Sequence, residues 1–134
     1  MEVTGPVIVR LFAASSAPDT DFTALLIDHH PGGYARNICE GVVRARYRAS
    51  WEHPELMEPG EIYELNIDLQ VTSNVFRRGH RIGLDISSSN FPRFDRNLNT
   101  GLNNNTSCET RVAQQTIYHD GQHPSCVLLP VVAR

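Results

Sequence analysis

The sequence predicts an all-β domain of the sandwich or barrel class. Within short segments, apolar and polar residues alternate with a period of two. This is the pattern of a β-strand, because its successive side chains point to opposite faces of the sheet. Turn-forming residues separate these runs, and no segment shows the period of a long helix. At 134 residues the chain matches one domain, residues 1–134, which is long enough to bury a core without disulfides or metals.

The clearest strand covers residues 61–71 and predicts a half-buried antiparallel strand with one apolar face. Its alternating apolar positions are Tyr63, Leu65, Ile67, Leu69 and Val71. Six further strands are expected at residues 7–14, 22–28, 38–47, 81–86, 113–118 and 126–132. The one helical turn that the sequence allows lies near residues 54–57.

Two departures from this pattern bear on the domain's boundaries. The first apolar run begins only six residues after the start of the chain, so an edge strand is expected to be missing or shortened in a domain cut from a longer chain. Residues 87–107 show no periodicity. A loop of about twenty residues is uncommon in a compact domain and is often functional or interfacial.

Composition excludes several classes of function. A net charge of −3 and a pI near 6.0 argue against nucleic-acid binding, which needs a basic surface to neutralise phosphates. No apolar run is long enough for a transmembrane helix, and the N-terminus does not resemble a signal peptide. The three cysteines, Cys39, Cys108 and Cys126, are expected to be free and mostly buried thiols in a reducing, cytoplasmic compartment.

No residue pattern predicts catalysis. Ser87, Ser88 and Ser89 follow a strand, but they lack the flanking glycines and the helix of a G-x-S-x-G nucleophile elbow. Asp120-Gly121 and Pro124 make the segment that carries His119 and His123 a turn rather than a helical zinc site. His29 and His30 are adjacent and point to opposite faces of a strand, so no transition-metal site is expected.

Two charged groups leave alternatives open. Asp19, Asp21 and Asp28 could supply oxygen ligands for calcium, although Asp19 after Pro18 also suits a turn-capping carboxylate. The other group is formed by Arg44, Arg46 and Arg48, which would share one face of a strand. That face would either hold carboxylates of a partner domain or be a solvated face with salt bridges.

Three stretches carry a family resemblance: residues 15–24, residues 79–97 with the run Ser-Asn-Phe-Pro-Arg-Phe-Asp-Arg-Asn, and residues 117–125. In order and spacing they resemble the C-terminal domain of the X-Pro dipeptidyl-peptidase and cocaine esterase class of serine hydrolases. The resemblance implies a jelly-roll β-sandwich of the galactose-binding-like type. It also implies a Ser-Asp-His triad in a preceding α/β-hydrolase domain, so this chain would hold no catalytic residue and no cofactor.

The function implied by this resemblance is that of an accessory domain. It would pack on the catalytic domain of a dipeptidyl-peptidase, ester hydrolase or acylase and help to wall its pocket. The expected interface lies within residues 88–97 and comprises Asn90, Phe91, Arg93, Phe94, Asp95, Arg96 and Asn97, because aromatic residues ringed by charges suit a contact surface.

Two alternatives to this interface stay open. Both phenylalanine rings could fold back into the core, whereas exposed rings are expected to promote self-association of the isolated domain. The chain could also be a free-standing module that binds carbohydrate or peptide, for which Trp51 would be exposed beside polar residues.

Overall fold

The computed structural model describes residues 1–133 and confirms the all-β prediction. Within those residues the only helical element is a short 3-10 turn, η1. The elements in chain order are β1 (Glu2–Ser15), β2 (Asp21–His29), β3 (Ala35–Arg44), η1 (Ala45–Tyr47), β4 (Tyr63–Val75), β5 (Arg81–Ser87), β6 (Gln115–Tyr118) and β7 (Cys126–Leu128). No helix in this range has the length and apolar character needed to cross a membrane.

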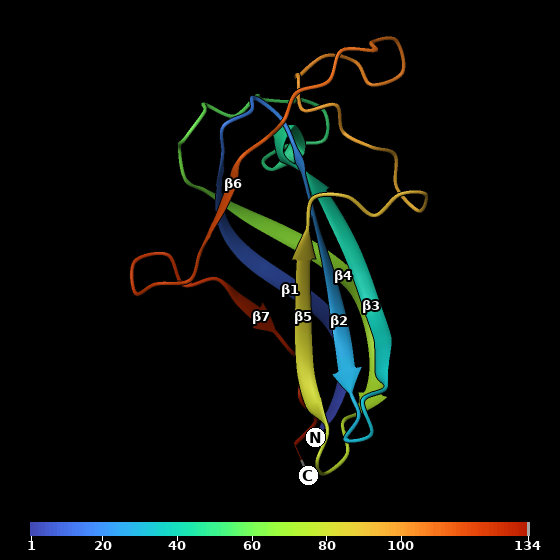
Figure 1. Ribbon diagram of the computed structural model, residues 1–134. Coiled ribbons are helices and arrows are strands. Elements are labelled where there is room, and N and C mark those ends of the chain that lie inside the picture. Colours follow the sequence, from blue (N-terminus) through green and yellow to red (C-terminus); the bar gives the residue numbers. More distant parts are fainter. Residues whose placement is uncertain (134) are drawn as a thin grey trace.

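The strands form two antiparallel sheets stacked as a β-sandwich (Figure 1). One sheet has the order β4-β1-β6, with β7 also paired to β1, and the other has the order β3-β2-β5. The long strand β1 pairs with β4 along most of its length and with the short β6 and β7 on its other side. The galactose-binding-like jelly-roll topology stays a prediction.

The core lies between the two sheets and is made by the alternating residues of the longest strands. Val7, Val9 and Leu11 of β1 face the same interior as Phe22, Ala24 and Leu26 of β2, and all six are at most 2% exposed. The predicted apolar face of β4 is confirmed at Leu65, Ile67 and Leu69, which are fully buried.

The alternation of β4 fails at Val71, which is 74% exposed. The register between β1 and β4 shifts here, because Pro6 pairs with Val71 whereas Ile8 pairs with Asp68. Gln70 adopts a positive φ of 65°, and its backbone N–H donates to the Asp68 carboxylate at 2.7 Å. This bulge adds one residue to β4 and turns the following side chains to the opposite face.

Several predicted boundaries were wrong. Residues 54–57 form no helical turn, and the 3-10 turn lies instead at Ala45–Tyr47, where it ends the strand that was expected to run to residue 47. The last strand ends at Leu128 rather than at residue 132, and β1 begins at Glu2, five residues before the predicted run. Short terminal pairings of this kind depend on neighbouring strands that periodicity does not reveal.

The long loop between β5 and β6 lies at one end of the sandwich, and the two chain termini lie at the other end (Figure 1). Residues 45–62, which link β3 to β4, lie at the same end as the loop. The aperiodic segment found in the sequence is therefore part of one terminal surface.

Candidate interface at the loop end of the sandwich

The loop that follows β5 is anchored to the buried start of β2. Asn97 donates from Nδ2 to the Asp19 carboxylate at 2.8 Å and to the Asp21 carboxylate at 2.7 Å. Asp19 is fully buried and Asp21 is 3% exposed. One amide thus ties the middle of the loop to two carboxylates that precede it by more than seventy residues.

Two arginines complete this network. The Arg44 guanidinium donates two hydrogen bonds to the Asp21 carboxylate, at 2.9 and 3.0 Å, and one to the Asp95 carboxylate of the loop at 3.1 Å. Arg46 donates from its side chain to Asp19 at 2.8 Å and to the carbonyl oxygen of Leu102 at 3.1 Å. The paired Asp21 carboxylate raises the pKa of Arg44 further above its usual range, so this guanidinium stays charged.

The prediction that Arg44, Arg46 and Arg48 share one strand face was wrong. Only Arg44 belongs to β3, since the 3-10 turn begins at Ala45. Arg48 donates to the carbonyl oxygens of Ala45 and Glu55, and its guanidinium lies 4.3 Å from the centre of the Tyr63 ring. The three cations therefore serve contacts within the domain.

The same network bears on the calcium alternative. The carboxylate oxygens of Asp19 and Asp21 accept hydrogen bonds from guanidinium, amide and backbone donors. Of these donors, the guanidinium groups of Arg44 and Arg46 supply the positive charge that calcium would otherwise supply. Asp28 lies seven residues after Asp21 in β2, which is about 23 Å along the strand at the usual rise per residue. The backbone N–H that the Asp19 carboxylate accepts belongs to Arg46 rather than to the turn after Pro18, so Asp19 fixes the segment after β3.

The predicted interface residues form an exposed rim on this anchored loop. Phe91 is 57% exposed and Phe94 is partly exposed, so neither ring is packed into the sandwich core. The Arg96 guanidinium lies 4.2 Å from the centre of the Phe91 ring, and Arg93 lies 5.7 Å from that of Phe94. These cation–π contacts keep the two guanidinium groups next to the aromatic rings.

Glu40 of β3 fixes the start of the loop. Its carboxylate accepts a hydrogen bond from the Asn90 side chain and pairs with Arg93 at 3.0 Å. Asn90 and Asn97 therefore anchor the two ends of the predicted interface, whereas Phe91, Arg93, Asp95 and Arg96 are exposed. The structure thus divides the predicted residues into the anchors Asn90 and Asn97 and side chains that are exposed or, for Phe94, partly exposed.

The sequence prediction left two aromatic residues out of this surface. Trp51 is 78% exposed and stacks on Tyr47, with ring centres 5.7 Å apart and planes inclined by 19°. Both line a groove of about 170 Å³ that also includes Phe94, Arg44 and Asp95. The available signal was the lone tryptophan in a polar, aperiodic segment, but only the fold brings it beside the loop after β5.

The three candidate serines directly precede Asn90 at the start of this loop. The Ser87 hydroxyl at the end of β5 donates to the backbone carbonyl of Ser89. The predicted turn after β6 is confirmed: the Asp120 carboxylate accepts backbone N–H bonds from Gln122 and His123 at 2.8 Å. These bonds lower the pKa of Asp120.

The prediction of free thiols is confirmed, but that of burial was wrong for two of them. All three cysteines are free; Cys108 and Cys126 are exposed, and Cys39 is half-buried. Burial raises the pKa of the Cys39 thiol.

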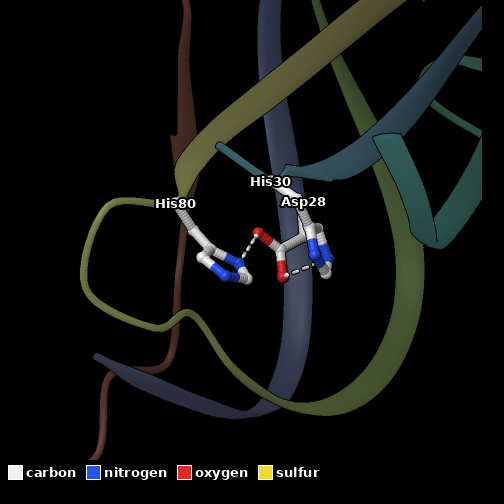
Figure 2. Close-up of side chains that lie close together, drawn as sticks. All are labelled: Asp28, His30 and His80. Atoms are coloured by element: carbon white, nitrogen blue, oxygen red, sulfur yellow. Dashed lines mark hydrogen bonds and ion pairs between the residues drawn. The ribbon is translucent and has the colours of Figure 1, made fainter. Parts of the chain in front are cut away.

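At the end of the sandwich that holds the termini, Asp28, His30 and His80 lie close together (Figure 2).

Comparisons with known proteins agree with this architecture. The cocaine esterase of Rhodococcus sp. (strain MB1 Bresler) is 51% identical over 136 aligned residues, which cover all of this chain and 24% of that protein. The crystal structure of an aminopeptidase from a marine sediment archaeon, Thaumarchaeota archaeon, matches 98% of the chain with a TM-score of 0.93 and 29% identity, over 24% of its own length. An α-amino acid ester hydrolase matches the same share of this chain with a TM-score of 0.90 and 28% identity.

The chain therefore spans about a quarter of the length of these relatives. The model of the X-Pro dipeptidyl-peptidase C-terminal non-catalytic domain family matches residues 1–128, almost the whole of the two sheets and their loops. Together with the identity to cocaine esterase, this match shows that the chain belongs to the X-Pro dipeptidyl-peptidase C-terminal non-catalytic domain family.

Proposed function

We propose that this domain docks on the catalytic α/β-hydrolase domain of its parent chain through the exposed side of the loop after β5, and that it helps to wall the acyl-binding pocket. The observation that carries this proposal is the exposed Phe91 ring on a loop held by the buried Asp19 and Asp21 carboxylates. The relatives are about four times longer than this chain, which supports an attached partner domain.

The loop has the side-chain composition of a protein interface, and its conformation is fixed by hydrogen bonds to the rest of the domain. Arginine and aromatic side chains dominate contact energies because they bury large surfaces and form directed bonds. Holding such side chains in place before contact lowers the entropy lost on docking. Here Asn97 and Asn90 provide that order, because they tie the loop to Asp19, Asp21 and Glu40.

The reaction of the parent would be acyl hydrolysis by a serine nucleophile in the preceding domain. A histidine base and an oxyanion hole there would supply the chemistry. Among the matched proteins are an esterase, an aminopeptidase and an ester hydrolase, as they are named. The choice among ester, amide and X-Pro peptide bonds would depend on pocket residues outside this chain.

A matched pair of substitutions in the full-length parent tests the docking. Phe91→Asp should lower the parent's melting temperature and its activity, because it places a charge in an apolar contact. Leu128→Asp is the control, since Leu128 is 46% exposed on β7 rather than on the loop. The isolated domain should melt at the same temperature with either change. Full activity and an unchanged melting temperature in the Phe91→Asp parent would reject this surface as the interface.

The exposed Trp51 supports a second candidate, the binding of carbohydrate or peptide in the adjoining groove. A planar ring exposed beside Arg44 and Asp95 offers both a stacking face and polar groups. Trp51 is the single tryptophan, so its fluorescence should report a ligand in the groove directly. Saturable quenching of the isolated domain by oligosaccharides, lost in Trp51→Ala, would favour this function over docking.

A further inference from the structure

The cluster of Asp28, His30 and His80 results from the pairing of β2 with β5. In this antiparallel ladder Asp28 pairs with Ile82 and His29 with Arg81. The next positions outward are His30 and His80, which are therefore placed opposite each other just beyond the last pair. Asp28 shares a face with His30 because residues two apart in a strand point the same way.

The three side chains converge at short range (Figure 2). His80 Nδ1 lies 2.9 Å from Asp28 Oδ1, and His30 Nε2 lies 3.7 Å from Asp28 Oδ2. One ligand atom from each residue falls within 4.8 Å of the others. The centres of the His30 and His80 rings are 4.2 Å apart, so the two imidazoles flank one carboxylate.

This cluster has donor atoms that the protein leaves unsatisfied. The Asp28 side chain is only 4% exposed, and within residues 1–133 its ion-pair partners are the two histidines rather than an arginine. His30 Nε2 is buried and has no hydrogen-bond partner, and the same holds for Asn74 Nδ2. Both residues line one cavity of about 380 Å³ beside Asp28 and His80. A buried imidazole nitrogen without a hydrogen-bond partner is costly unless a ligand in the cavity satisfies it.

We propose that Asp28, His30 and His80 bind a divalent transition metal of the zinc type, with the cavity beside Asn74 open to a fourth ligand. Two imidazole nitrogens and one carboxylate oxygen are a ligand set that zinc accepts in tetrahedral geometry. At bond lengths of about 2.1 Å, tetrahedral ligand atoms lie about 3.4 Å apart. One ligand atom from each residue already lies within 4.8 Å of the others, so small side-chain rotations reach that spacing.

Binding changes the protonation of the cluster. Coordination needs a lone pair on each ligating imidazole nitrogen, so the proton between His80 Nδ1 and Asp28 Oδ1 must move when the metal enters: in a neutral imidazole it is transferred to Nε2, and from an imidazolium it is released to solvent. Arg36 and Arg77 also line the cavity. Both are exposed, so solvent screens their repulsion of a cation, and their charge favours an anionic fourth ligand.

The metal would join two segments far apart in the sequence. His30 follows β2 and His80 precedes β5, and the turn from β4 to β5 carries Arg77 and His80. Since the ligand geometry exists only in the folded chain, binding stabilises the fold by mass action. The sequence prediction of no transition-metal site weighed His29 and His30 without their partner strand and did not consider His80.

Titration with Zn²⁺ and Co²⁺ tests the site in the purified chain. The exposed Cys108 and Cys126 should first be alkylated so that thiolates do not bind the metal. We expect one metal per chain, intense visible Co²⁺ bands typical of four-coordination, and a melting temperature that rises by at least about 5 °C at a hundredfold excess over Kd.

His30→Ala is the decisive variant, because His30 Nε2 makes no hydrogen bond that its loss would break. Its ring also packs against Tyr34 and His80, so the melting temperature of each metal-free variant is measured first and the shift on adding metal is compared with it. It should weaken metal binding at least tenfold and remove the Co²⁺ bands. His80→Asn keeps a donor toward Asp28 while removing the ligand, and should do the same. His119→Ala, in the turn after β6, is the matched control and should bind as the unmodified chain does. Equal binding by His30→Ala and the control, or the absence of Co²⁺ bands in the unmodified chain, would overturn the proposal.

Discussion

The side chain of Asn97 lies 2.8 Å from the carboxylate of Asp19, a residue 78 positions earlier in the chain. Asp19 is fully buried and also accepts hydrogen bonds from the backbone and side chain of Arg46. The contact therefore links the exposed loop after β5 to the turn between β1 and β2. It makes the conformation of the loop depend on the interior of the domain.

Replacing Asn97 by Ala should destabilise the domain by about 1.5–3 kcal/mol, because hydrogen bonds to charged groups are lost while Asp19 stays buried. Chemical denaturation measures the change. Asn105→Ala is the control, since Asn105 is exposed and its side chain makes no hydrogen bond within residues 1–133. Equal stability of the two variants would mean that Asn97 does not anchor the loop.

Gly41→Ala should be strongly destabilising because β3 and β4 approach each other closely at this point. A Cβ atom at Gly41 would lie 2.0 Å from the backbone oxygen of Asp68. A backbone atom cannot move aside as a flexible side chain can, so overpacking should cost about 1–3 kcal/mol or more. Gly121→Ala is the control, because nothing lies within 4 Å of its Cβ position. A melting temperature for Gly41→Ala as high as that of the control would contradict the close approach.

The two faces of β4 should respond differently to substitution. Leu65→Ala should cost about 2–5 kcal/mol, since Leu65 is fully buried and the change leaves a cavity. Asn66→Ala should cost under about 0.5 kcal/mol, because Asn66 is exposed. Urea unfolding of both variants checks the pair, and similar losses at the two positions would show that both faces of the strand are covered.

The isolated domain should self-associate through the exposed Phe91. An apolar ring that is 57% exposed beside a partly exposed Phe94 leaves a surface from which water is readily displaced. Sedimentation velocity over a range of concentrations should show a rising apparent mass, and Phe91→Ser should remove that rise. A monomer at every concentration would contradict this prediction.

Thiol labelling at pH 8 should separate the three cysteines. Cys108 and Cys126 are exposed and should react rapidly with a disulfide reagent, whereas the half-buried Cys39 should react slowly. Burial raises the pKa of Cys39 and so lowers the fraction of reactive thiolate at this pH. Its rate should increase as the pH rises toward that pKa. A rate for Cys39 equal to that of Cys108 would contradict its shielding.

Much of the architecture could be predicted from the sequence, because strand alternation records which face of each strand meets the core. The buried residues Leu65, Ile67 and Leu69 were assigned in this way, and so was the turn at Asp120. The assignment failed at Val71, where the bulge at Gln70 reverses the faces. A bulge depends on pairing with another strand, and the pattern of one strand does not contain it.

The sequence by itself determined the all-β class, the alternating core and the aperiodic, aromatic character of the loop after β5, whereas the exposure of Phe91 was found only in the structure. These properties depend on local periodicity and composition, which act within one strand or loop. Only the tertiary structure decided that Arg44 and Arg46 bind Asp21 and Asp19, that Trp51 lies beside Phe94, and that His30 meets His80. Each of these contacts joins residues far apart in the chain, so it exists only once strand register and sheet packing have brought them together.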